Sequence, residues 1–181
     1  PGSEDFFDAL DSYVDVDAMI DYYIAELYIA NTDWPSSNLE LWKLKNDTAR
    51  WRYFFFDSDA SFMWINDDQL SEYNNTMPDY QRHPEYCTII MRTALNNKEF
   101  RDRFFREFHY HLSTTFSTEK VINEINRLEK KYAELMPEHI YRWNNPTNYN
   151  KWLMNVASLR TFAMQRPSYL HKQLVQNFGN P

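Results

Sequence analysis

The sequence predicts a mainly α-helical domain with one small β-hairpin, an α+β arrangement, and three observations lead to this expectation. Apolar residues recur at helical spacing near the front of the chain and again over most of its second half. Two short segments, 39–45 and 51–57, are rich in residues that favour strands and flank a polar turn. Apolar residues make up 43% and aromatic residues 18% of the 181 positions, so the chain can bury a core of its own.

The first helix is expected over residues 15–30, DVDAMIDYYIAELYIA. Asp15 is a residue type that caps helix N-termini, because its carboxylate accepts from the free backbone N–H groups of the first turn. The helix should end near Asn31, since Pro35 disfavours helical backbone at Trp34.

The two strand segments, joined by a turn at 46–48, are expected to form the only sheet. WRYFFFD is almost continuously apolar, and such strands are typically buried on both faces. Residues 58–84 contain prolines and paired asparagines, so we expect a long loop there. This loop would lie inside a single domain that spans residues 5–178. The segment before that domain, residues 1–4, is typical of a cloning remnant.

The chain from residue 85 onward reads as helical. Helices are expected at 85–95, 97–112, 118–135, 147–165 and 167–178. Ser117 is suited to cap the third of these, and Pro167 to the first turn of the last. In the stretch RDRFFREF the helical period separates phenylalanines from arginines. A solvated amphipathic helix is therefore favoured over a nucleic-acid-binding stripe.

Composition excludes several classes of function. The net charge is −7, with 26 acidic against 19 basic side chains, so duplex nucleic acid is not an expected partner. The longest apolar stretches are too short for a membrane span, and no signal peptide is present. The single cysteine, Cys87, excludes an internal disulfide and a cysteine-based zinc site, and is expected to be buried.

Glycine is scarce. The chain has only two, Gly2 and Gly179, whereas phosphate-cradling loops need glycine so that backbone N–H groups can approach the phosphates. If the protein handles a nucleotide, we expect the cover over its phosphates to come from outside this sequence.

The stretch NTDWPSSN places Asp33 and Asn38 five residues apart on a turn. An aspartate that orients an acceptor hydroxyl, followed five residues later by a magnesium-binding asparagine, is the pattern of a kinase catalytic loop. The alternative is ordinary turn chemistry, in which both side chains satisfy local N–H groups at a helix exit.

Asp57 and Asp59 come at the end of the second expected strand. Side chains two apart on a strand share a face, so the two carboxylates would repel each other unless a cation lies between them. Mg²⁺, or Mn²⁺ in its place, prefers such oxygen ligands. The alternative is a turn that merely ends the strand, although the order of the two motifs favours the metal site.

The histidines offer weaker candidates. His109 and His111 lie two apart on an expected helix, hence on nearly opposite sides, and cannot share one metal ion. His83, His139 and His171 are isolated and are expected at the surface or in packing.

A rival interpretation is a non-catalytic surface, carbohydrate-binding or scaffold module. It rests on tryptophans that could stack on sugar rings, although most of them fit the expected strands or helices as core residues. They are Trp42, Trp51, Trp64, Trp143 and Trp152.

Several motifs together resemble the CotH spore-coat kinase family. NTDWPSSN, LELWKLK and WRYFFFDSDASF occur in this order and are similar to the core of that family. LNNKEFRDRFFREFHYHLSTTFS, MPEHIYRW and LRTFAMQRPSYLHKQL resemble its helical tail. The resemblance runs from about Tyr13 to Leu174 and implies a protein-kinase-like C-terminal lobe.

The resemblance implies an atypical kinase that uses ATP and Mg²⁺ to phosphorylate serine in a protein substrate. Asp33 would be the catalytic aspartate, Asn38 and Asp57 would bind the metal, and Asp59 would bind a second ion or hold the loop. Ser37 stands where family members often carry asparagine. Such proteins are bacterial and belong to the spore coat, the cell surface or the secreted fraction. We expect this piece to lack the nucleotide-binding N-lobe and to be inactive alone, and its oligomeric state is left open.

Overall fold

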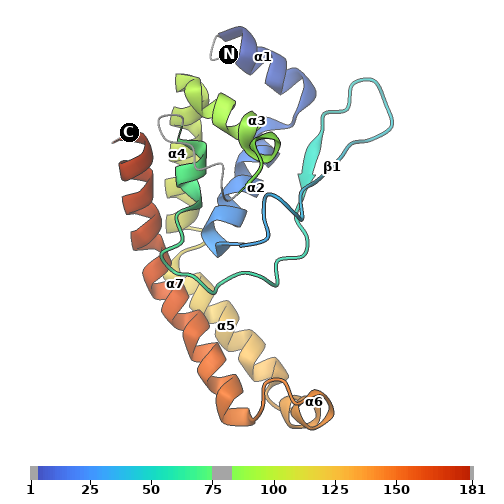
Figure 1. Cartoon of the computed structure of the whole chain (residues 1–181), viewed down its shortest axis with the longest axis vertical. Coiled ribbons are helices and arrows are strands. Elements are labelled where there is room, and N and C mark those ends of the chain that lie inside the picture. The colour runs from blue at the N-terminus through green and yellow to red at the C-terminus, as the bar shows by residue number, and fades with distance from the viewer. Residues whose placement is uncertain (1–3, 75–82, 180–181) are drawn as a thin grey trace.

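The computed structural model describes residues 4–74 and 83–179, and it confirms a mainly α-helical fold with one β-hairpin (Figure 1). The helices are α1 (Glu4–Tyr13), α2 (Val16–Ile29), the 3₁₀-helix η1 (Gln69–Tyr73), α3 (Glu85–Asn96), α4 (Lys98–Ser113), α5 (Thr118–Tyr132), α6 (Met136–Trp143) and α7 (Tyr149–Phe178). The strands β1 (Glu40–Trp42) and β2 (Arg52–Phe54) pair antiparallel. None of the helices described combines the length and apolar character that crossing a bilayer requires.

The elements form a body and an arm. In the body, α2 contacts α4, β2 and the second half of α7, and α3 packs on α4 and η1 (Figure 1). The arm consists of α5 paired with the first half of α7, and α6 lies at its far end. Because α7 runs through both parts, it links the arm to the helices that surround α2.

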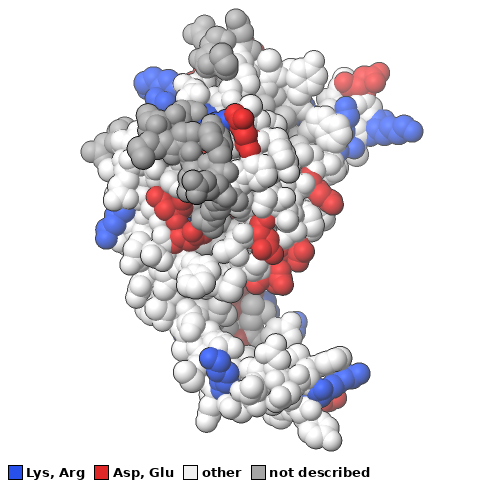
Figure 2. All heavy atoms as spheres, viewed as in Figure 1, with Lys and Arg blue, Asp and Glu red and all other residues white. Residues whose placement is uncertain are grey.

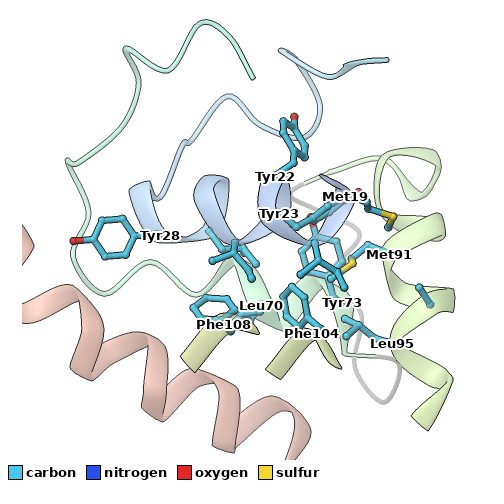
Figure 3. Close-up of a cluster of buried hydrophobic side chains, with 14 of the residues drawn as sticks. Met19, Tyr22, Tyr23, Tyr28, Leu70, Tyr73, Met91, Leu95, Phe104 and Phe108 are labelled. Atoms are coloured by element: carbon cyan, nitrogen blue, oxygen red, sulfur yellow. The ribbon is translucent and has the colours of Figure 1, made fainter. Parts of the chain in front are cut away.

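The core is built around α2, ten of whose residues are buried. Figure 3 shows Tyr23 of α2 meeting Met91 of α3, Phe104 of α4 and Tyr73 of η1, all of them at most 1% exposed. Tyr22 points to the other side of α2, away from this cluster. The helix is therefore apolar nearly all round, as expected of a central helix.

Both ends of α2 agree with the sequence-based expectation. The Asp15 side chain caps it by accepting from the Ala18 N–H at 3.2 Å, and Arg52 pairs with the same carboxylate at 2.7 Å. Burial raises the pKa of Asp15, but the Ala18 N–H and the Arg52 guanidinium outweigh it and hold the pKa below its usual value. Ala30 ends the helix in the left-handed conformation, at φ 53°.

The expectation for the second strand was wrong. The strands are three residues each, not seven, and Trp51, Phe54 and Phe55 are all exposed rather than buried on both faces. The physical reason is that a two-stranded sheet has only one partner layer. Tyr53 is buried against α2, where its ring stacks on that of Tyr22 with centroids 4.9 Å apart, and the half-exposed Phe55 ring meets Tyr22 edge-on.

Two helices, α1 and α6, were not expected, and two that were expected are one. The continuous helix α7 replaces the separate segments 147–165 and 167–178, with Pro167 in its interior. Proline has no N–H to offer the carbonyl four residues earlier. That carbonyl, of Ala163, instead accepts from the Thr118 hydroxyl at 3.2 Å, so packing against α5 compensates for the break.

The remaining boundaries differ less. The helices α3, α4 and α5 begin and end within a few residues of expectation, and Asn97 caps α4 by accepting from the Phe100 N–H. Ser117 precedes α5 as predicted, but its hydroxyl donates to the Thr114 carbonyl instead of capping. The expected loop 58–84 contains η1, and its residues 75–82 lie outside the described part of the chain.

One buried arginine joins three parts of the body. Arg166 of α7 is fully buried, and its guanidinium donates to four backbone carbonyls. Two of these, Leu27 and Tyr28, end α2, and two, Ile65 and Asp67, lie in the following loop. Burial lowers the pKa of Arg166 to about 10, so the group stays charged at neutral pH.

Replacing Arg166 should therefore destabilise the whole body. Arg166→Met keeps most of the volume but removes the donor to those four carbonyls, although the Asp67 carbonyl still accepts from the Gln173 amide. We expect the free energy of unfolding to fall by about 3 kcal/mol in urea denaturation. The control is Arg160→Met on the same helix, where the partly exposed pairing with Asn126 and Glu129 should be worth less than about 1 kcal/mol. Equal losses for the two variants would contradict the role given to Arg166.

Candidate functional site

Two loops meet beside the C-terminal end of α2. The first loop, residues 30–39, follows α2, and the second loop, residues 55–62, follows β2. The Thr32 N–H and hydroxyl both reach the Ala60 carbonyl, at 3.1 and 3.2 Å, and the Phe62 N–H donates to the Ile29 carbonyl at 2.8 Å. These bonds hold the two loops side by side, although the strands of the hairpin separate them in the chain.

The structure brings together two of the residues predicted to bind metal. The Asn38 side-chain amide donates to the Asp57 carbonyl at 3.1 Å. Both residues have a left-handed backbone, with φ 57° and φ 50°. Asparagine and aspartate tolerate this region better than other side chains, which explains why these residue types suit the two corners.

The expected strand geometry of Asp57 and Asp59 is wrong. β2 ends at Phe54, so the two carboxylates do not share a face of a sheet, and both are exposed on the second loop. A two-residue alternation requires extended backbone, which the left-handed Asp57 interrupts. Among the residues described, no three His, Cys, Asp or Glu side chains converge as a metal-binding group.

Asp33 is exposed on the first loop, and two hydrogen bonds hold its backbone. Its N–H donates to the Asn31 side-chain oxygen at 3.3 Å, and its carbonyl accepts from the Ser37 N–H at 2.8 Å. The backbone of Asp33 is thus fixed on both sides while its carboxylate faces solvent. This is the arrangement needed for a side chain that meets a mobile substrate.

A buried acid lies beneath the first loop. Glu26 of α2 is fully buried and accepts from the Asn31 amide at 3.0 Å, while Gln69 of η1 donates to the Asn31 carbonyl at 2.6 Å. Burial raises the pKa of Glu26 to about 7, against which the Asn31 amide acts weakly. The sequence analysis missed this residue, yet a glutamate inside an otherwise apolar helix was a usable signal.

Aromatic packing anchors the same loop. Trp34 is fully buried, and its ring meets those of Tyr22 and Tyr23 edge-on at 6.1 and 5.1 Å. Tyr22 also donates to the Asn38 carbonyl at 3.4 Å, and burial raises the pKa of its hydroxyl well above the usual value. The indole therefore holds the middle of the loop in the core together with the buried Pro35, and Asp33 before them and Ser36 after them are exposed.

The histidines mostly play the packing roles expected of them. His109 contacts the Phe105 carbonyl and His111 contacts Asp21, so the two do not share a partner. His83 is buried and lies against the first loop, which the sequence did not indicate. Cys87 is buried and free, as expected.

The expectation that most of the five tryptophans lie in the core was wrong. Four are exposed, and they lie on the hairpin, the loop after it and α6: Trp42, Trp51, Trp64 and Trp143. Cations cover two of them, because Lys43 lies over the Trp51 ring and Arg52 over the Trp42 ring. Two of the exposed indoles, Trp42 and Trp51, thus share the hairpin, and the other two lie on separate elements.

The donor set at the meeting of the two loops fits a divalent cation. The hydrogen bond between Asn38 and Asp57 uses an amide nitrogen and a backbone carbonyl. It leaves the Asn38 side-chain oxygen and the Asp57 carboxylate with lone pairs available. Oxygen atoms of these two kinds are suitable ligands for Mg²⁺ or Mn²⁺.

The helical body thus presents an exposed aspartate, Asp33, and a hydrogen-bonded asparagine–aspartate pair, Asn38 and Asp57, on adjoining loops. Comparison with protein families assigns the chain more closely, since a family model described as CotH kinase protein matches residues 2–170. The protein belongs to the CotH kinase family. No curated protein and no solved structure matches the chain.

The raised pKa of Glu26 predicts a pH dependence of stability. An unfolded glutamate ionises near pH 4.5, whereas the folded one keeps its proton up to about pH 7. The contribution of Glu26 to the unfolding free energy should therefore be highest below pH 4.5, fall by about 3 kcal/mol as the pH rises to 7, and stay level above it.

The measurement is urea denaturation of the wild type and of Glu26→Gln from pH 4.5 to 8. The difference between the two should change across this range, because glutamine cannot ionise. Glu119→Gln, at an exposed position in the first turn of α5, serves as the control and should follow the wild type. A constant difference between wild type and Glu26→Gln would show that Glu26 does not titrate there.

Proposed function

We propose that this protein is an atypical serine protein kinase in which the two adjoining loops carry the groups for phosphoryl transfer from ATP. Membership of the CotH kinase family supports kinase-like function in general. The observation that carries the finer proposal is the Asn38–Asp57 hydrogen bond, which joins two candidate ligands 19 residues apart.

Asn38 and Asp57 would hold the divalent cation, Mg²⁺ or Mn²⁺, through the Asn38 side-chain oxygen and the Asp57 carboxylate. Asp59, exposed two residues later, would add a ligand for a second ion or hold the loop. When bound, the cation supplies charge neutralisation to the phosphate oxygens of ATP. The protein would place the cation, because the left-handed backbone at Asn38 and Asp57 sets where the ligand oxygens lie.

Asp33 would orient the serine hydroxyl of the protein substrate and accept its proton. Its carboxylate is exposed, and the Asn31 side chain and the Ser37 N–H fix its backbone. Little covalent help is needed in phosphoryl transfer, so correct placement of the acceptor supplies much of the rate.

The charge distribution is consistent with a site that takes its nucleotide together with a cation. Figure 2 shows acidic side chains gathered across the middle of the body on this face, with basic ones toward its edges. A triphosphate would be repelled by such a surface unless a divalent ion came with it. We therefore expect ATP to bind weakly in the absence of metal.

Substitutions in the two loops should separate metal binding from phosphoryl transfer. Asp57→Asn should weaken Mn²⁺ binding in calorimetry at least tenfold, because it removes a charged ligand. Asp33→Asn should leave Mn²⁺ binding unchanged. In a longer form of the protein that adds the expected nucleotide-binding lobe, with Mg-ATP and a peptide whose only hydroxyl residue is serine, Asp33→Asn should lower phosphate transfer by about 100-fold or more.

The control is Asp47→Asn, an exposed aspartate in the turn of the hairpin, which should change neither quantity. Mn²⁺ binding by Asp57→Asn as tight as that of the wild type would overturn the proposed metal site. Peptide phosphorylation by Asp33→Asn at the wild-type rate would overturn the role of Asp33.

A further inference from the structure

A serine on the first loop has partners that its neighbours lack. Ser36 is exposed, and its hydroxyl oxygen lies 3.2 Å from Nδ1 of His83. The other ring nitrogen of His83, Nε2, lies 3.6 Å from the Glu72 carboxylate. A serine, a histidine and an acid are thus in contact in that order, three residues from Asp33.

The positions of His83 and Glu72 determine which ring nitrogen of His83 faces Ser36 and which faces the acid. His83 and Glu72 are each 4% exposed, and Nε2 of His83 lies near the Glu72 carboxylate but beyond hydrogen-bonding distance. The Glu72 carboxylate favours the tautomer of His83 that carries its proton on Nε2, and Nδ1 is then left to accept from Ser36. A hydroxyl bonded to a histidine that is oriented by an acid is the arrangement of an activated nucleophile.

We propose that Ser36 is a phosphate acceptor within the protein itself, a self-phosphorylation site activated by His83. The proposal rests on the proposed function, which supplies ATP as the phosphoryl donor. Ser36 Oγ bonds to the γ-phosphorus while the bond from that phosphorus to the β,γ-bridging oxygen breaks. ADP leaves with the electron pair, and the serine proton passes to Nδ1 of His83. Glu72 is a positioning residue, since it acts through the imidazole.

The chain supplies a matched control in the next residue. Ser37 is exposed on the same loop, but within the described part of the chain its hydroxyl forms no hydrogen bond. The two serines therefore differ in their side-chain partners while sharing the loop and its exposure. Any reactivity that is due to His83 should appear at Ser36 and be absent at Ser37.

The first arm of the test measures activation without ATP or metal. A fluorophosphonate probe phosphonylates an activated serine, with loss of fluoride, and peptide mass spectrometry locates the adduct. We expect labelling at Ser36, none in Ser36→Ala, and an unchanged rate in Ser37→Ala. His83→Gln should label about 100-fold more slowly. Because His83 is buried, its substitution can also impair folding, so a thermal melt of each variant shows whether it is folded. The variant Glu72→Gln tests the activation without changing His83 itself.

The second arm incubates a longer form of the protein, which adds the nucleotide-binding lobe that this chain is expected to lack, with Mg-ATP and a serine peptide, and locates phosphate on both. Phosphate on Ser36 that disappears in Ser36→Ala and persists in Ser37→Ala supports the proposal. A phosphorylated peptide with no phosphate on Ser36 overturns the self-phosphorylation site and leaves the kinase intact. No phosphate on either overturns the proposed function and self-phosphorylation with it. Absence of fluorophosphonate labelling at Ser36 overturns the activation by His83 in every case.

Discussion

The bonds from the buried guanidinium of Arg166 to four backbone carbonyls are the interaction on which the rest of the structure depends. The last carbonyls of a helix have no partners within that helix, and here two of them receive theirs from another element. Arg166 thereby fixes where α2 ends, joins the loop at Ile65 and Asp67 to the same point, and fastens α7 across both. The first loop begins two residues after Tyr28, so its starting direction is set by this contact.

From that fixed point the site is built in layers. Glu26, Asn31 and Gln69 form a buried polar layer under the first loop, and Trp34 inserts between aromatic rings beside it. The polar layer fixes the backbone at Asn31, and the Trp34 indole anchors the middle of the loop in the core. The Asp33 side chain, which lies between these two anchors, therefore faces solvent. This division explains how a loop without glycine keeps one shape.

The proposed chemistry depends on two kinds of preorganisation on one loop. On one side, Asn38 is bonded to the backbone of Asp57, and the metal ligands would come from side-chain oxygens that this bond leaves available. On the other, Ser36 lies against a buried histidine and acid. Both arise because the first loop contacts the second loop, which contributes Asp57, and the segment before α3, which contributes His83.

The sequence by itself determined the helical class, the first helix and its aspartate cap, the hairpin, and the residues Asp33, Asn38 and Asp57 as candidates, because these follow from periodicity and local spacing. Only the tertiary structure decided that α7 passes through Pro167, since the donor that replaces its missing N–H is Thr118, 45 residues away along the chain from Ala163. It also decided that the second strand is exposed, and that Glu26, His83 and Arg166 lie beside the loops. The contacts of His83 and Arg166 join residues far apart in the chain and leave no local pattern, so no spacing rule could have revealed them, whereas the glutamate within an apolar helix was a local signal that the spacing rules did not use.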